Sequence, residues 1–116
     1  MLARLRRSLA RTTDDLHADA LQARFASTDT TRIADAPDRG AVRIRGEVSG
    51  LQVVPRADAR ALEVTLDDGS GQAVVVFTGR TRLGGLDPGR PVEVVGMARR
   101  AHGRLVLLNP EYRLLA

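Results

Sequence analysis

The sequence contains no cysteine, no lysine and no tryptophan among its 116 residues. The absence of cysteine excludes disulfide bonds and thiolate chemistry, which fits a reducing cytoplasm. No apolar run approaches the roughly 20 residues that a membrane-spanning helix needs. The basic first residues are followed by no apolar stretch of about seven or more, so no secretory signal peptide is expected. We therefore expect a soluble cytoplasmic protein.

Aromatic residues are also scarce. Phe25, Phe77 and Tyr112 are the only ones in the chain. Proteins that hold single-stranded nucleic acid usually stack its bases on aromatic side chains. If this chain binds such a strand, it must do so mainly through other contacts.

The charge is carried unevenly along the chain. The 18 basic residues are all arginine, against 14 acidic residues, which gives a net charge of +4 and a sequence pI near 11.1. Residues 1–11 hold four arginines and no acid, residues 12–40 three arginines and six aspartates, and residues 41–116 eleven arginines and eight acids. A GC-rich coding bias explains the use of arginine as well as selection for phosphate binding does. The balance permits a polyanionic partner without requiring one.

The first 26 residues have a helical pattern. Leu2, Leu5, Leu9, Leu16, Ala20 and Ala23 lie near one stripe, with Leu21 and Phe25 beside it. Thr12 followed by Asp15 matches a helix cap, so residues 3–26 predict one helix or a helix that restarts at Thr12. The basic start, ARLRRSLAR, would follow phosphates in one interpretation. In the other, the leucine stripe packs on the rest of the protein, binds a protein partner or pairs with a second copy.

After a connector at residues 33–40 the apolar period changes to two, which indicates β-strands. We expect strands at residues 42–49, 61–67, 72–77, 91–100 and 104–115, the last interrupted by Pro110. Residues 54–60 are expected to form a loop, and residues 79–90 a loop or short helical turn. Gly46 and Gly96, in the middle of two strands, suit the strong coiling of a small barrel.

These elements predict a mainly β protein. The expected fold is a five-stranded Greek-key OB-fold barrel over residues 39–116, preceded by an N-terminal α-helical extension and connector over residues 1–38. The third strand is continuous enough in apolar residues to be buried on both faces for part of its length.

Four stretches in order carry a resemblance to a known family: VRIRGEV, LEVTLDDGSGQAVVVF, DPGRPVEVVG and GRLVLLNPE. They resemble the OB-fold nucleic-acid-binding family, and within it the anticodon-binding and RecG helicase wedge types. Together with the leading helix, the chain is similar to small stand-alone actinobacterial OB-fold proteins. The resemblance covers residues 33–116 well and implies a nucleic-acid-binding module. The shared residues are mostly turn glycines and core apolar residues, which specify the barrel and not its ligand.

In an OB-fold a ligand is expected to lie across the second and third strands. The outward positions of the second strand are Ala61, Glu63, Thr65 and Asp67, and two of these are acids that oppose phosphate. Phe77 is expected to fill the core, with an outward stacking role as the alternative.

Basic residues gather instead at the expected rim. The candidate nucleic-acid-binding residues are Arg43, Arg45, Arg56, Arg60, Arg80, Arg82, Arg99, Arg100, His102 and Arg104. Guanidinium groups make bidentate phosphate contacts and lie flat on bases, so such a rim can follow a strand without aromatic residues. The alternative is a solubilising surface. Binding through the rim is expected to be weak, tolerant of sequence and strongly dependent on salt.

No catalytic, metal or cofactor site is expected. DDGSG (residues 67–71) has the glycine spacing of a phosphate loop but lacks its G-K-[ST] ending, and is predicted to be a hairpin turn. Asp14 and His17 form only a two-residue pair. The sequence therefore favours a non-enzymatic, weakly sequence-specific module for nucleic acid, either single-stranded DNA or RNA or a junction, with single strands preferred. A protein-interaction or scaffold OB domain is the alternative.

Overall fold

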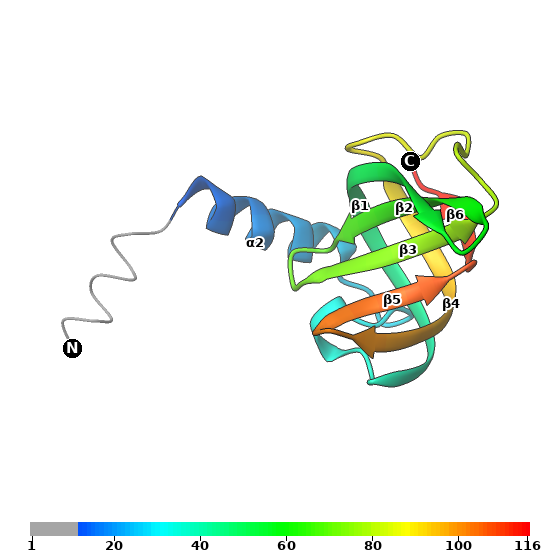
Figure 1. The fold of residues 1–116 in the computed structure, drawn as a ribbon. Coiled ribbons are helices and arrows are strands. Elements are labelled where there is room, and N and C mark those ends of the chain that lie inside the picture. Colours follow the sequence, from blue (N-terminus) through cyan, green and yellow to red (C-terminus); the bar gives the residue numbers. More distant parts are fainter. Residues whose placement is uncertain (1–11) are drawn as a thin grey trace.

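The computed structural model describes residues 12–116 (Figure 1). It contains helix α2 (Thr13–Phe25), the short 3-10 helix η1 (Ile33–Asp35) and strands β1 (Arg39–Arg56), β2 (Ala59–Asp67), β3 (Gln72–Thr78), β4 (Pro91–Ala101), β5 (Arg104–Leu108) and β6 (Glu111–Leu114). The predicted helix over residues 3–11, with its arginines and leucines, lies outside the described residues. No helix within residues 12–116 is long and apolar enough to cross a membrane.

Helix α2 begins at the predicted cap. The Thr12 hydroxyl accepts a hydrogen bond from the Asp15 backbone N–H at 3.2 Å, and the Asp15 carboxylate accepts one from the Thr12 N–H at 3.1 Å. Within the described residues the predicted apolar stripe is wrong, because Leu16 is 59% exposed whereas Leu21 and Phe25, which were placed beside the stripe, are buried. The helix contacts the barrel from His17 onward, where Nε2 of His17 lies 3.7 Å from the Glu47 carboxylate, but its buried residues, Leu21 and Phe25, lie in its C-terminal half.

Five strands close into a ring in the order β1, β2, β3, β5, β4, because β1 pairs with β4 as well as with β2. All pairings in the ring are antiparallel except that of β3 with β5. This confirms the predicted closed five-stranded Greek-key barrel. The last predicted strand is divided at Asn109 and Pro110, and its second half, β6, pairs with the first half of β4.

The two mid-strand glycines lie where other chain segments come close. A Cβ atom at Gly46 would lie 3.1 Å from the Asp67 backbone oxygen, and one at Gly96 would lie 3.0 Å from Cβ of Pro110. Neighbouring strands can therefore approach at both points, as the barrel's tight coiling requires.

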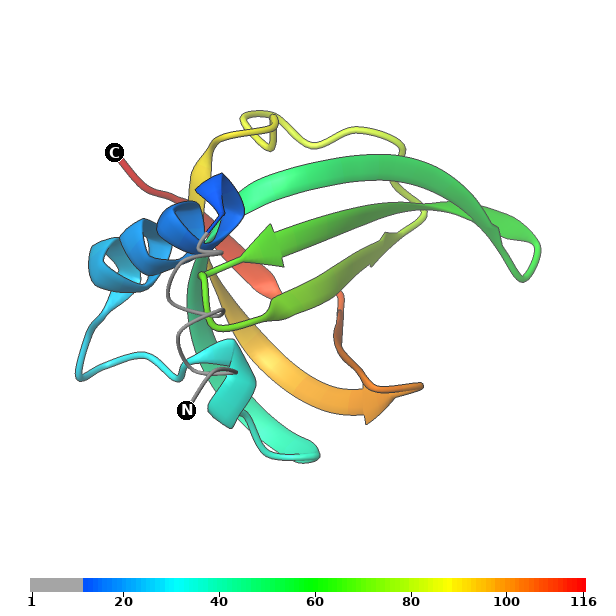
Figure 2. The same cartoon turned by 90° about the vertical axis from the view of Figure 1, so that its left-hand side faces the viewer.

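The loop predicted at residues 54–60 is wrong. Strand β1 continues to Arg56 and β2 begins at Ala59, so two residues form the turn between them. Val53 and Val54 pair with Leu62 and Ala61, and this pairing extends the hairpin. Figure 2 shows the β1–β2 hairpin projecting beyond the end of β3. Residues 79–90 form a loop, with no helix among them.

The core lies inside the ring. Its largest fully buried side chains are Ile33, Ile44, Leu66, Leu105, Leu107, Val48, Val64, Val75, Val92 and Val94. Strand β3 is also buried on its outer face, where Val74 and Val76 pack with Ala61 beneath Val54 and Val106. The prediction that this strand is buried on both faces is confirmed.

The predicted turn at DDGSG is confirmed, and Asp68 makes it an anchor. This buried carboxylate accepts hydrogen bonds from the backbone N–H of Ser70 at 2.9 Å and of Gly71 at 3.2 Å, and from the Ser70 hydroxyl at 2.6 Å. Its other oxygen accepts the Ile33 N–H at 2.9 Å. The turn therefore holds η1 against the barrel, and the Asp68 carboxylate has a structural role.

Candidate functional site

The outer face of β2 and β3, where a ligand was expected, is partly covered by protein. Ala61, Val74 and Val76 are 0%, 4% and 2% exposed, and Val54 and Val106 pack against them. Of the predicted acids on this face, Glu63 accepts a hydrogen bond from the Gln52 amide at 3.2 Å. The apolar part of the expected platform is therefore buried, and the part that stays accessible carries the acids Glu63 and Asp67.

An open groove lies next to this covered face. It has a volume of about 400 Å³ and is lined by Arg39, Arg56, Met97, Ala98, Arg99, Val106 and Leu108. The two ends of β1 supply Arg39 and Arg56, β4 supplies Met97 to Arg99, and β5 supplies the remaining two residues. Arg39 and Arg99 are cross-strand partners, which brings their charges together. We call this feature the arginine groove.

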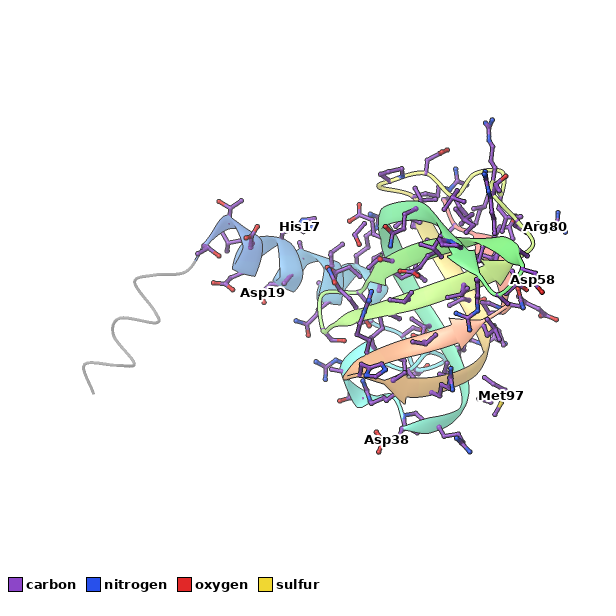
Figure 3. The ribbon with its side chains drawn as sticks, viewed as in Figure 1. His17, Asp19, Asp38, Asp58, Arg80 and Met97 are labelled. Atoms are coloured by element: carbon purple, nitrogen blue, oxygen red, sulfur yellow. The ribbon has the colours of Figure 1, made fainter. Side chains whose placement is uncertain are left out.

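The arginine groove has an apolar floor and a cationic border. Met97 is 63% exposed and Leu108 50% exposed, and together with Val106 they form an exposed apolar patch. None of the described residues that line the groove is acidic. Figure 3 shows Met97 at the end of the molecule away from α2, together with Asp58, which lies in the β1–β2 turn. The groove therefore offers an anionic ligand cations and an apolar contact surface together.

Arg43 and Arg45 lie elsewhere, around Glu93. Nη1 of Arg43 and Nε of Arg45 each donate to the Glu93 carboxylate at 3.0 Å, and Nη2 of Arg113 donates to it at 3.2 Å. Glu93 itself is only 3% exposed. Arg113 was not predicted, although it is the cross-strand partner of Glu93. We call Arg43, Arg45 and Arg113 the arginine trio.

The arginine trio keeps Glu93 ionised. Burial on its own would raise the pKa of this carboxyl group. Hydrogen bonds from Arg45 and Arg113, with the charges of Arg113 and Arg43, outweigh burial and leave the pKa of Glu93 below its ordinary value of 4.5. A negative charge therefore stays at the centre of the three cations at neutral pH.

The pH dependence of stability tests this arrangement. A carboxyl whose pKa is lowered by folding stabilises the protein above its unfolded-state pKa, and this contribution is lost as pH falls through the lowered folded-state pKa. We expect Glu93→Gln to reduce the free energy of unfolding most above pH 4.5. The difference from the parent protein should shrink as the pH falls below that value, in urea titrations at a series of pH values.

Glu63→Gln is the matched control, because the carboxylate of Glu63 has a neutral amide as its hydrogen-bond partner. Its effect on the free energy of unfolding should be smaller. An effect of Glu93→Gln that stays constant from pH 7 to well below pH 4.5 would contradict the lowered pKa.

Arg100 holds the connector. Its Nη2 donates to the backbone oxygens of Ile33 at 3.2 Å and Ala36 at 3.1 Å, and its Nε lies 3.4 Å from the Asp38 carboxylate. The Arg100 side chain is only 28% exposed, because these contacts hold its guanidinium against the connector. Arg99 and Arg100 are neighbours in sequence, yet their side chains serve different parts of the molecule.

The remaining predicted residues are exposed and spread around the barrel. His102 and Gly103 form the β4–β5 turn, with φ of 53° and 76°, and Arg104 begins β5 on the same face as Val106. Arg60 lies near the start of β2, and Arg80 and Arg82 lie in the 79–90 loop. Of the ten predicted residues, the arginine groove brings together Arg56 and Arg99, joined by the unpredicted Arg39.

Phe77 lies in the core, as expected. Its ring meets that of Tyr112 edge to face, with centroids 5.6 Å apart. Neither ring lines the arginine groove. Within residues 12–116, no three His, Cys, Asp or Glu side chains are grouped closely enough to hold a metal ion.

Comparison with solved structures supports the assignment of the fold. The chain is similar to a chain in "Structure and Conformational Change of a Replication Protein A Heterotrimer Bound to ssDNA", with a TM-score of 0.52 and 15% identity, over 78% of this chain and 69% of that one. The fold is an OB-fold. No family model and no curated protein matches the sequence. The predicted fold class is thus confirmed.

Proposed function

We propose that this OB-fold is a non-enzymatic module that binds single-stranded DNA or RNA in the arginine groove. The observation that carries the proposal is the convergence of Arg39, Arg56 and Arg99 on an exposed apolar floor. In this proposal residues 39–116 form the binding domain, and residues 1–38 are its extension.

The chemistry of a single strand matches both parts of the groove. Its phosphates are attracted to the three guanidiniums, which offer bidentate hydrogen bonds. Its unpaired bases can cover Met97, Val106 and Leu108, because thioether sulfur and aliphatic groups make favourable contacts with aromatic rings. Guanidiniums also stack on bases. A duplex hides its base faces, so it gains only the phosphate contacts.

The groove lining contains few groups that could distinguish one base from another. Sequence is read by hydrogen bonds to base edges, and here the floor is apolar while the cations suit phosphate. We therefore expect binding that is tolerant of sequence. The similarity of the fold to a replication protein A chain, whose structure was determined with bound ssDNA, supports this choice of ligand class.

Other predicted residues have secondary roles in this proposal. Arg104 and His102 would extend the border of the groove along β5 and its preceding turn, and Arg60 lies on β2, in the same hairpin as Arg56. Arg80 and Arg82 would meet only a longer strand. Arg100 supports the site by holding the connector in place.

Fluorescence anisotropy with labelled single-stranded DNA, single-stranded RNA and duplex, each at about 50 and 200 mM salt, tests the proposal. Three phosphate contacts to a single strand give a slope of about −2 in log K against log salt, so affinity should fall roughly 20-fold between these concentrations. The duplex should bind more weakly than either single strand. Absence of binding at about 50 mM salt would overturn the proposal.

The exposed floor also supports a second candidate, a protein-interaction domain. Met97 at 63% and Leu108 at 50% exposure could receive the apolar side chains of an acidic peptide, whose carboxylates would meet the same arginines. The two candidates differ in their ligand, so the anisotropy experiment separates them. Three cations and a lining free of described acidic residues suit either ligand. We favour nucleic acid because the fold is similar to that of a replication protein A chain whose structure was determined with bound ssDNA.

A further inference from the structure

The outer face of the β1–β4 pair continues beyond the arginine groove. The register places Arg39 opposite Arg99, Ala41 opposite Met97, Arg43 opposite Val95 and Arg45 opposite Glu93. Because Val42, Ile44, Val92 and Val94 point into the core, these alternate positions all point outward. The arginine groove and the arginine trio are therefore the two ends of one face.

The arginine trio is held in a fixed arrangement. Each guanidinium has five N–H donors, and each gives one hydrogen bond to Glu93. The side chains of Arg43, Arg45 and Arg113 remain 47%, 32% and 62% exposed. Donors are thus left for a ligand from solvent. One buried carboxylate among three cations leaves a positive excess, and it fixes their spacing before any ligand arrives.

The spacing along this face suits an extended strand. Arg39 and Arg45 are six positions apart on β1, or about 20 Å at the usual rise of roughly 3.3 Å per residue. On β1 and β4 the outward positions between them are Ala41, Arg43, Val95 and Met97, none of which is acidic. The exposed Glu111 of β6 pairs with Val95 and lies on the far side of β4 from β1. A phosphodiester backbone that leaves the groove at Arg39 and Arg99 and follows β1 therefore reaches the trio without crossing an acidic position of β1.

We propose that the arginine trio is a second phosphate-binding site, reached by the backbone of a strand whose other end lies in the arginine groove. The link to nucleic acid rests on the proposed function, whereas the affinity of the trio for phosphate does not. The ligand chemistry is a phosphate oxyanion, supplied either by a nucleic-acid backbone or by free phosphate.

Substitution of Asp29 tests the proposal through an expected gain of phosphate affinity. This residue lines the same shallow basin as Arg43, Arg45, Glu93 and Arg113. Its carboxylate opposes an anion there, so Asp29→Asn should strengthen phosphate binding. A purely structural role for the trio predicts no such gain.

The experiment compares labelled oligothymidylates of about 4 and 12 nucleotides, a range that spans typical OB-fold site sizes. Arg113→Gln should weaken binding of the longer strand about fivefold and reduce its salt slope by about 0.7, while the short strand is unaffected. Asp29→Asn should tighten binding of the longer strand. Arg24→Gln removes the same charge from an exposed position on α2 and is the control. Thermal unfolding verifies that each variant is folded.

A separate titration with inorganic phosphate, followed through the arginine Nε–H resonances, makes failure of this site distinct from failure of the groove. If no oligonucleotide binds, the proposed function fails. The phosphate site would still be supported by saturable shifts at Arg43, Arg45 and Arg113 that Arg113→Gln removes. Absence of these shifts would overturn the phosphate site. If strands bind but Arg113→Gln affects both lengths equally or neither, the proposed backbone path is wrong.

Discussion

Replacement of Gly69 by alanine is expected to displace helix α2 and to lower the free energy of unfolding by about 2–4 kcal/mol. Gly69 has a φ of +85°, and a Cβ atom there would overlap the Ala18 backbone oxygen and lie 2.7 Å from the Gln22 nitrogen. These are helix backbone atoms, so the helix itself has to move. Leu21 and Phe25 then lose their burial, and the left-handed backbone adds its own strain.

Urea unfolding would measure the loss, and amide hydrogen exchange over Thr13–Phe25 would report the release of the helix. Gly79→Ala is the matched control. Gly79 has a similar φ of +73°, but no heavy atom lies within 4 Å of the position its Cβ would take. It should therefore show the backbone strain alone, about 1–2 kcal/mol, without faster exchange in α2. Equal effects of the two substitutions would mean that the approach of α2 to this turn is not stabilising.

The double substitution Arg56→Gln and Arg99→Gln is expected to lower the affinity for single-stranded DNA roughly 30-fold or more at low salt. The two side chains approach the arginine groove from the β1–β2 hairpin and from β4, so their loss removes cations from both sides. The salt slope should fall by about 1.4, corresponding to two phosphate contacts on a single strand. Anisotropy titrations at several salt concentrations measure both quantities.

Arg24→Gln with Arg90→Gln changes the net charge equally, at exposed positions on α2 and just before β4, and is the control for the overall charge. It should leave the affinity within about twofold of the parent value, because well-separated surface charges are screened by salt. A similar loss in both double variants would assign binding to net charge rather than to the groove.

The barrel was predictable because its signals are local. Alternating apolar residues, the break at Pro110 and the cap at Thr12 each act within a few residues of the chain. Burial of Val74 and Val76 followed from the apolar run of the third strand, but the residues that pack against them did not. Val54 reaches this cluster because the β1–β2 pairing continues past Val53, where a loop was predicted.

The candidate site was harder to predict than the fold, since it depends on strand pairing. Arg39 falls at the end of the expected connector, and becomes a groove residue only through its pairing with Arg99. Arg113 reaches Glu93 only because β6 pairs with β4. The sequence does not distinguish Arg100 from its neighbour Arg99. The guanidinium of Arg100 donates to backbone carbonyls because η1 and the residue after it lie beside it.

The parallel pairing of β3 with β5 has a consequence for how the chain folds. Strands β1, β2 and β3 are joined by short turns and can form early, whereas closure needs Ala73 to meet Leu105, far along the sequence. Before β5 docks, the sheet has open edges at β3 and β4, and open apolar edges invite pairing with other molecules. Docking of the segment Arg104–Leu108 is therefore the step that pairs both open edges and closes the barrel.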